Sequence, residues 1–183
     1  LTQNRRVAVK SGHKVGKSTL AAAIALWWTS DPISRPFARV VITAPTDRQV
    51  KGIVWREIRR LYHRAQVRGQ PLGGTGHLDP GTGIQWPDGR EIVGFATDQA
   101  ERIAGYSGEH ILFIADEASG VASEIFEAIE GNRAGGGSLL MLGNPTRPSG
   151  EFFNAFNAAS TWGARFTISS RDTPNATGKG QPI

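Results

Sequence analysis

The sequence predicts a three-layer α/β domain with a mainly parallel central sheet, and three observations support that fold class. A short apolar run, residues 7–9, leads through a glycine-containing loop into an Ala-rich run, residues 20–28. Further apolar runs alternate with segments of helical periodicity along the chain. Two of these runs end in polar motifs, Asp116-Glu117 and residues 143–146. Alternating strands and helices favour a parallel sheet that binds ligands at the carboxyl ends of its strands.

The composition is that of a globular domain with an excess of positive charge. The chain has 183 residues, 39% hydrophobic and 20% charged, which is enough for one domain with a sizeable core. Its net charge of +5 favours a polyanionic partner weakly. The absence of cysteine excludes a disulfide framework and a cysteine-type zinc site. The longest apolar run, residues 20–28, is too short to cross a bilayer, so no membrane partner is expected.

Residues 11–19, SGHKVGKST, are predicted to form a phosphate-binding loop, because the G-K-S follows a strand and opens a helix. Backbone N–H groups and the positive end of the helix would face phosphate oxygens. Lys17 would reach the β- and γ-phosphates, and the Ser18 hydroxyl would bind Mg²⁺. The standard pattern has glycine where this chain has Ser11, and Gly12 comes one place late.

Every residue of this loop is a candidate for nucleotide contact. His13 and Lys14 add two cations, which either bind phosphate or remain solvated. The alternative for the whole stretch is a glycine turn before an ordinary helix, which its context disfavours. The predicted nucleotide-binding set is Ser11, Gly12, His13, Lys14, Val15, Gly16, Lys17, Ser18 and Thr19.

A buried strand and a long amphipathic helix are predicted next. Arg39–Ala44 is β-branched and nearly continuous in its apolar character, as a buried parallel strand should be. Over residues 47–66 apolar side chains recur at helical spacing and leave an arginine-rich outer face. That face either contacts DNA phosphates without sequence preference or is simply solvated. Its cations are Arg48, Lys51, Arg56, Arg59, Arg60, Arg64 and, just beyond, Arg68.

The middle of the chain predicts a loop, a hairpin and a second loop. Residues 69–83 are rich in Gly and Pro and are expected to be an exposed loop. Residues 84–86 and 91–95 read as a hairpin closed by a turn. The polar residues 99–108 hold Arg102, which we expect in a mobile loop.

Two more strands and two helices complete the predicted domain. The apolar runs at residues 110–115 and 138–142 are expected to be buried strands, with a short helix at residues 123–130 between them. A helix at residues 151–159 and a strand at residues 164–169 follow. We expect the domain to occupy residues 1–170, with a polar linker at 171–183.

Asp116 and Glu117 are predicted to supply the second half of the chemistry. An aspartate at a strand end can hold Mg²⁺ opposite the phosphate loop, and the adjacent glutamate can activate water as a general base. The alternative is a polar turn after a strand. A P-loop kinase does not need a water-activating glutamate here. The pair therefore predicts an NTP hydrolase of the ASCE, RecA-like branch, in which the catalytic Glu follows the metal Asp.

Two further candidates concern the γ-phosphate. In a sheet where residues 138–142 lie beside the phosphate-loop strand, Asn144 or Thr146 would sense the γ-phosphate or the attacking water. The alternative is an Asn-Pro turn. Arg102 is a candidate for an arginine supplied by a neighbouring subunit to stabilise transition-state charge, and its alternative is a surface arginine.

As an ordered set, the motifs resemble the large terminase subunit of tailed bacteriophages and prophages. The stretches SGHKVGKST, ITAPTDRQV, ERIAGYSGEHILFIADEAS and LLMLGNPTRPSGEFFNAF cover nearly the whole chain in the order of that family. GNPTRPSGEF is the most specific, because generic ATPases do not share it. Phosphate loops of the family commonly depart from the standard first glycine, as Ser11 does.

The resemblance implies roles for single residues. By position, Lys17 and Ser18 would bind phosphate and Mg²⁺, Asp116 would bind Mg²⁺, and Glu117 would activate water. Arg102 matches the candidate arginine finger that acts in trans. Some members carry an arginine inside the phosphate loop, where this chain has His13 and Lys14. The family's coupling motif matches Gly143, Asn144 and Thr146.

The resemblance also implies an ATP-driven motor that pumps double-stranded DNA through the portal into a procapsid. Its implied partners are DNA bound without sequence preference, the portal protein, the small terminase subunit and copies of itself in a ring. It would work in the cytoplasm of the bacterial host. The chain starts at Leu1 without methionine, and we expect a missing upstream segment. It stops before any carboxylate cluster of the family's nuclease domain, so nuclease activity is expected only of the parent protein.

Two other functions remain open from the residues. A helicase-like or other RecA-type translocase would share the ATP chemistry, but helicases usually need a second RecA-like domain, whose motifs are not found here. A nucleotide-binding switch or scaffold with negligible turnover is disfavoured by Glu117.

Overall fold

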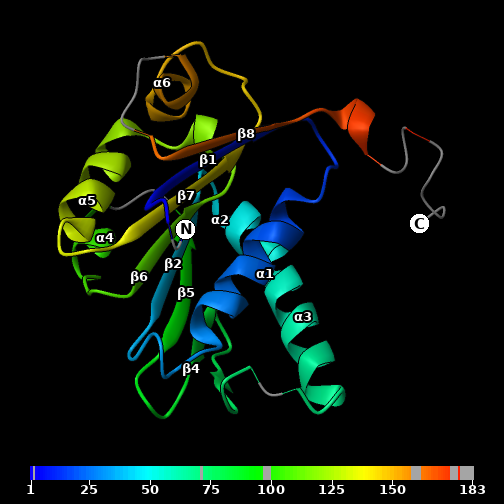
Figure 1. Ribbon diagram of the computed structural model, residues 1–183, viewed down its shortest axis with the longest axis vertical. Coiled ribbons are helices and arrows are strands. Elements are labelled where there is room, and N and C mark those ends of the chain that lie inside the picture. Colours follow the sequence, from blue (N-terminus) through cyan, green and yellow to red (C-terminus); the bar gives the residue numbers. More distant parts are fainter. Residues whose placement is uncertain (2, 71, 97–99, 158–161, 174–176, 178–183) are drawn as a thin grey trace.

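The strands of the described residues form one eight-stranded sheet. Figure 1 shows how the strands and helices are arranged. The computed structural model describes all residues except 2, 71, 97–99, 158–161, 174–176 and 178–183. Within the described residues the strands are β1 (Arg6–Ser11), β2 (Arg39–Ala44), β3 (His77–Leu78), β4 (Gly83–Gln85), β5 (Glu91–Ala96), β6 (Ile111–Ala115), β7 (Ser138–Gly143) and β8 (Ala164–Ile168). Their order is β3-β4-β5-β2-β6-β7-β1-β8, and all pairs from β5 to β8 are parallel.

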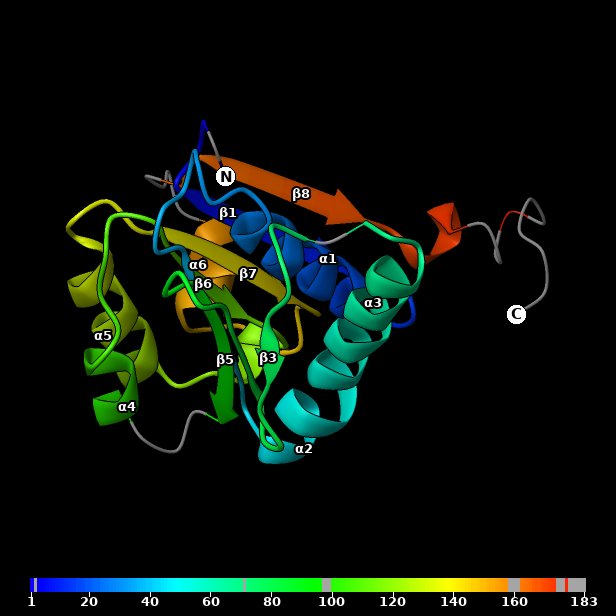
Figure 2. The same cartoon turned by 90° about the horizontal axis from the view of Figure 1, so that it is seen from below.

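Helices cover both faces of the sheet, which gives the three predicted layers. The helices are α1 (Lys17–Thr29), α2 (Asp47–Gln49), α3 (Trp55–Val67), α4 (Ala100–Ala104), α5 (Ser123–Arg133) and α6 (Glu151–Asn157). Figures 1 and 2 show α1 and α3 on one side of the sheet and α4, α5 and α6 on the other. No helix among the described residues is long and apolar enough to span a membrane.

Two hydrophobic clusters follow from the alternation of side chains along buried strands. In β6, Leu112 and Ile114 belong to the cluster beneath α1 and α3. Their neighbours Ile111 and Phe113 belong to the cluster beneath α4, α5 and α6. Because both faces of β6 are covered, its sequence is apolar at every position, as predicted for residues 110–115.

The predicted helix at residues 47–66 is present, with one irregularity. The Thr46 side chain accepts a hydrogen bond from the backbone N of Gln49 and caps the start. A π-helical turn, Val50–Val54, then joins α2 to α3. The turn packs closely on the sheet, since a Cβ placed on Gly94 in β5 would lie 2.9 Å from Val50 Cγ1.

The structure corrects two of the predicted loops. The stretch 69–83 contains β3, which pairs antiparallel with β4 through Leu78 and Ile84, so the predicted hairpin gains a third strand. Arg102 lies in α4 rather than in a loop, because its neighbour Ile103 is fully buried and fixes the segment. Residues 158–159 of the last predicted helix, and most of 171–183, lie outside the described residues.

We expect Ile114→Ala to lower the free energy of unfolding by about 2–5 kcal/mol, because it leaves a cavity in the middle of the sheet. Ile114 is fully buried, whereas Ile33 is 91% exposed. The matched change Ile33→Ala should stay within about 0.5 kcal/mol of wild type. Urea unfolding of the purified protein measures both, and equal losses would contradict the placement of β6 in the core.

Candidate active site

The candidate residues meet where three neighbouring strands end. Strand β7 lies between β6 and β1. The predicted role of Asn144 or Thr146 at the γ-phosphate depended on this placement beside the phosphate-loop strand. Because these strands are parallel, their carboxyl ends share one edge of the sheet. The phosphate loop, the Asp116-Glu117 pair and the segment after Gly143 each begin at that edge.

The phosphate loop owes its shape to two glycines. Gly16 has φ of 88° directly before α1, a conformation that glycine adopts without strain. A Cβ on Gly12 would lie 2.9 Å from Ser170 Cβ, so glycine is needed where the chain after β8 crosses the loop. Ser11 is still part of β1 and pairs with Ile168, so no glycine is needed there. The late glycine of the motif is thus explained by packing.

Lys17 folds back over the phosphate loop. It is only 9% exposed, and its Nζ donates hydrogen bonds to the backbone O of Gly12 at 3.0 Å and to Asn144 Oδ1 at 3.1 Å. Its Nζ also lies 3.8 Å from Glu117 Oε1. The ammonium group is therefore central to the site and in contact with all three motifs.

Ser18 and Asp116 are hydrogen-bonded although they are far apart in the sequence. Ser18 Oγ donates to Asp116 Oδ2 at 3.2 Å. Asp116 is 2% exposed, and its Oδ1 has no hydrogen-bond partner among the described residues. A buried carboxylate oxygen left open beside a hydroxyl suits a Mg²⁺ ion, because burial without compensation is unfavourable.

The composition of the site also fits Mg²⁺ better than an all-protein metal centre. Among the described residues, no three His, Cys, Asp or Glu side chains gather in a metal-binding group. Mg²⁺ is usually held by one or two protein groups together with substrate phosphates and water. Ser18 and Asp116 are the protein groups that would hold it here.

The two acids differ in their surroundings. Burial raises the pKa of Asp116 to about 6, and the charge of Glu117 adds to the effect, whereas hydrogen bonding to Ser18 and the charge of Lys17 oppose it. The Glu117 side chain is 34% exposed. Its backbone has φ of 49°, a left-handed conformation that is unusual for glutamate and turns the chain sharply after β6.

Asn144 connects the end of β7 with the phosphate loop. It is 4% exposed, and its Oδ1 accepts from Lys17. Its Nδ2 lies 2.9 Å from His13 Nδ1 and 3.0 Å from His13 Nε2, so one ring nitrogen can accept a hydrogen bond from the amide. Of the two basic residues predicted for the loop, His13 therefore contacts the segment after β7. The Asn144 side chain thus links this segment to both Lys17 and His13.

Comparison with known proteins decides the family. No family model matches the sequence. The probable terminase large subunit of Enterobacteria phage P7 is 32% identical over 156 residues, which are 81% of this chain and 30% of that protein. The chain belongs to the terminase large-subunit family. It spans less than a third of the length of this curated relative.

Solved terminase structures share the fold. The large terminase ATPase domain of Thermus phage P74-26 matches 92% of this chain and 77% of its own, with a TM-score of 0.66 and 18% identity. The large terminase of a thermophilic bacteriophage, in complex with ADP, matches 92% of this chain and 40% of its own, with a TM-score of 0.66 and 13% identity. The predicted RecA-like P-loop fold is thereby confirmed.

Arg102 of this terminase chain lies apart from the other candidates. It is exposed on α4, beside a cavity of about 400 Å³ that Phe95 and Tyr106 also line. The preceding strand, β5, is separated from β1 by three strands, which corresponds to roughly 19 Å at the usual strand spacing. Figure 1 shows α4 on the face opposite α1. One chain alone does not bring Arg102 to its own phosphate loop.

One residue of the terminase site was missed in the sequence. Ser119 Oγ donates to the backbone O of Asn144 at 2.6 Å and lies 3.0 Å from Thr146 Oγ1. Its only signal in the sequence is its place two residues after Glu117, which does not reveal a contact with the segment after β7.

Without metal, the terminase domain should become less stable as the pH rises from about 4 to 6. The native state retains a proton on Asp116 up to about pH 6, whereas the unfolded chain releases it near 3.8. The free energy of unfolding therefore falls across this window, by about 3 kcal/mol. Asp116→Asn should match wild type near pH 4 and be more stable at pH 8, as measured by urea unfolding in a chelator.

Asp88→Asn serves as a control of opposite sign. A hydrogen bond from Arg90 lowers the pKa of Asp88, so its ionised form stabilises the fold above about pH 4. This variant should be the less stable protein at pH 8. An Asp116→Asn profile parallel to that of wild type at every pH would contradict the burial of an ionised Asp116.

Proposed function

We propose that this terminase domain hydrolyses ATP with Mg²⁺ and that hydrolysis drives double-stranded DNA into a procapsid. The observation that carries the proposal is the Ser18–Asp116 hydrogen bond, around which Lys17, Glu117 and Asn144 converge. The family relationship supports packaging over helicase activity. The ADP in the complex of the thermophilic bacteriophage terminase supports an adenine nucleotide.

In this proposal the phosphate loop and Lys17 bind the β- and γ-phosphates. The acceptors that Lys17 now contacts, Gly12 O and Asn144 Oδ1, are neutral, so anionic phosphate oxygens would compete well for its protons. Ser18 and Asp116 would hold Mg²⁺, which would neutralise charge on the phosphates. Backbone N–H groups between Gly12 and Lys17 would face the remaining oxygens.

Glu117 would act as the general base. It is less buried than Asp116, and its carboxylate lies at the rim of the site, 3.8 Å from the lysine that binds the γ-phosphate. A water oxygen forms a bond to the γ-phosphorus while the bond to the β–γ bridging oxygen breaks. Glu117 accepts the proton of that water, and the electron pair of the broken bond stays on ADP.

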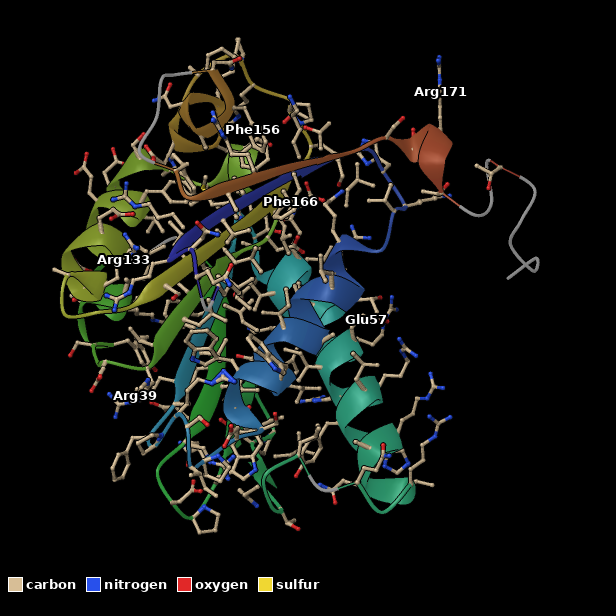
Figure 3. All side chains as sticks on the ribbon, in the orientation of Figure 1. Arg39, Glu57, Arg133, Phe156, Phe166 and Arg171 are labelled. Atoms are coloured by element: carbon tan, nitrogen blue, oxygen red, sulfur yellow. The ribbon has the colours of Figure 1, made fainter. Side chains whose placement is uncertain are left out.

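The arginine-rich face of α3 is proposed to contact DNA phosphates or a neighbouring subunit. Figure 3 shows side chains of this helix pointing away from the domain. Arg60 pairs with Glu57, whereas the exposed Arg56, Arg64 and Arg68 form no salt bridge with any described residue. Phosphate contacts of this kind give affinity without sequence preference.

The remaining parts of the proposal concern the assembly. The domain would occupy residues 1–170, with residues 171–183 as a linker toward a nuclease domain of the parent protein. Copies of the chain would form a ring that docks on the procapsid portal in the cytoplasm of the bacterial host, with the portal protein and the small terminase subunit as partners. Arg102 would complete the site of the adjacent subunit.

Glu117→Gln should lower the kcat of ATP hydrolysis by the assembled motor about 10²- to 10⁴-fold, because the amide cannot accept the proton of the water. Nucleotide affinity should be retained, since Lys17, Ser18 and Asp116 are unchanged. The matched change Glu127→Gln, on the exposed side of α5, should leave turnover at the wild-type level. Equal turnover by Glu117→Gln and wild type would remove Glu117 as the base.

Mixed rings test whether Arg102 acts in trans. Rings made only of Arg102→Ala or only of Glu117→Gln subunits should both be nearly inactive. If Arg102 serves the neighbour, mixed rings regain turnover at each interface where an intact Arg102 meets an intact Glu117. If it acts within its own chain, no mixture regains activity. Arg5→Ala, at an exposed arginine before β1, is the control and should not impair turnover.

A further inference from the structure

The hydroxyl of Ser119 joins the turn after Glu117 to the segment after β7. Ser119 lies in the 3₁₀ turn Ala118–Gly120 and is 9% exposed. Its single proton goes to the backbone O of Asn144, because a carbonyl can only accept. Thr146 Oγ1, at 3.0 Å, must then be the donor to Ser119 Oγ. The hydrogen bonds therefore run in one direction, from Thr146 through Ser119 to Asn144.

The two segments are also packed directly against each other. A Cβ on Gly143 would lie 3.1 Å from the backbone N of Ala118 and 3.3 Å from the ring of Phe152, so a larger residue here would force these neighbours to shift. The backbone O of Asn144 receives a second hydrogen bond, from the backbone N of Thr146 at 2.8 Å. Two donors on one carbonyl fix the peptide after Asn144 and thereby help to orient its side chain.

This orientation places the Asn144 amide between Lys17 and His13. Lys17 in turn lies 3.8 Å from Glu117, only two residues before Ser119. These residues thus form a closed series of contacts. It runs from Glu117 along the chain to Ser119, by hydrogen bonds to Asn144 and Lys17, and from Lys17 back to Glu117. A phosphate that draws Lys17 away from Asn144 would change two of these contacts, the hydrogen bond of Lys17 to Asn144 and its ion pair with Glu117.

We propose that Ser119 is a positioning residue that holds Asn144 and Glu117 in one unit, so that γ-phosphate at Lys17 is sensed where water is activated. The inference rests on the proposed ATP hydrolysis. The Ser119 hydroxyl is hydrogen-bonded to Asn144 and Thr146 and not to Lys17 or Ser18, so its loss should spare nucleotide binding. What it should disturb is the alignment of Glu117 with Asn144, and hence the rate of hydrolysis and its coupling to DNA movement.

Ser119→Ala in the assembled motor removes the hydroxyl with little change of volume. We expect kcat to fall about tenfold, a loss of about 1.4 kcal/mol in transition-state stabilisation. The KM for ATP and the Kd of a fluorescent ADP analogue should stay within about twofold of wild type. The length of DNA packaged per ATP should also fall. Ser123→Ala, the same change at the exposed first residue of α5, should leave all four quantities unchanged.

A double-mutant cycle with Thr146→Val separates the relay from ordinary packing. Once Ser119→Ala has broken the chain of hydroxyls, the added Thr146→Val should cost little, so the two effects on kcat should be clearly less than additive. Additive effects would overturn the proposal. Wild-type kcat and packaging in Ser119→Ala would also overturn it. So would a loss of activity that is fully explained by a smaller fraction of folded motor. A wild-type motor that binds ATP without turnover would instead overturn the proposed function.

Discussion

The hydrogen bond between Ser18 and Asp116 is the contact on which the rest of the site depends. It joins the first turn of α1 to the end of β6 across the intervening end of β7. Asp116 is buried beside a second acid, and its Oδ1 has no hydrogen-bond partner among the described residues, which is unfavourable for an ionised carboxylate without a bound metal ion. The site is therefore destabilised in the absence of its ligand, and metal binding would recover that energy.

The same reasoning accounts for the position of Lys17. In this structure its ammonium group donates hydrogen bonds to the backbone O of Gly12 and to Asn144 Oδ1. Anionic phosphate oxygens would replace these two neutral oxygen acceptors, so the lysine would exchange the protein's acceptors for those of a ligand. Asn144 would lose a hydrogen-bond partner in that exchange. Nucleotide binding at the phosphate loop would therefore change the contacts of the segment after β7 through the Asn144 side chain.

Under the proposed function, the distribution of the candidates over the sheet would divide the chemistry between subunits. The candidate residues around Asp116 follow β1, β6 and β7, which are adjacent in the sheet. Arg102 follows β5, beyond β2, on the face covered by α4 and α5. The proposed base and metal site would then lie at one place and the proposed arginine finger at another, which suits a ring in which neighbours complete each other's sites.

The sequence alone determined the local features: the phosphate loop, the buried strands, the Asp116-Glu117 pair and the polar end of β7. Each of these features depends on a short stretch of consecutive residues, whose periodicity or motif predicts it for a direct physical reason. Only the tertiary structure decided the need for Gly12, the strand β3, the helix around Arg102 and the contact of Ser119 with Asn144. These depend on groups far apart in the chain that meet only after the sheet has assembled, so no local pattern records them.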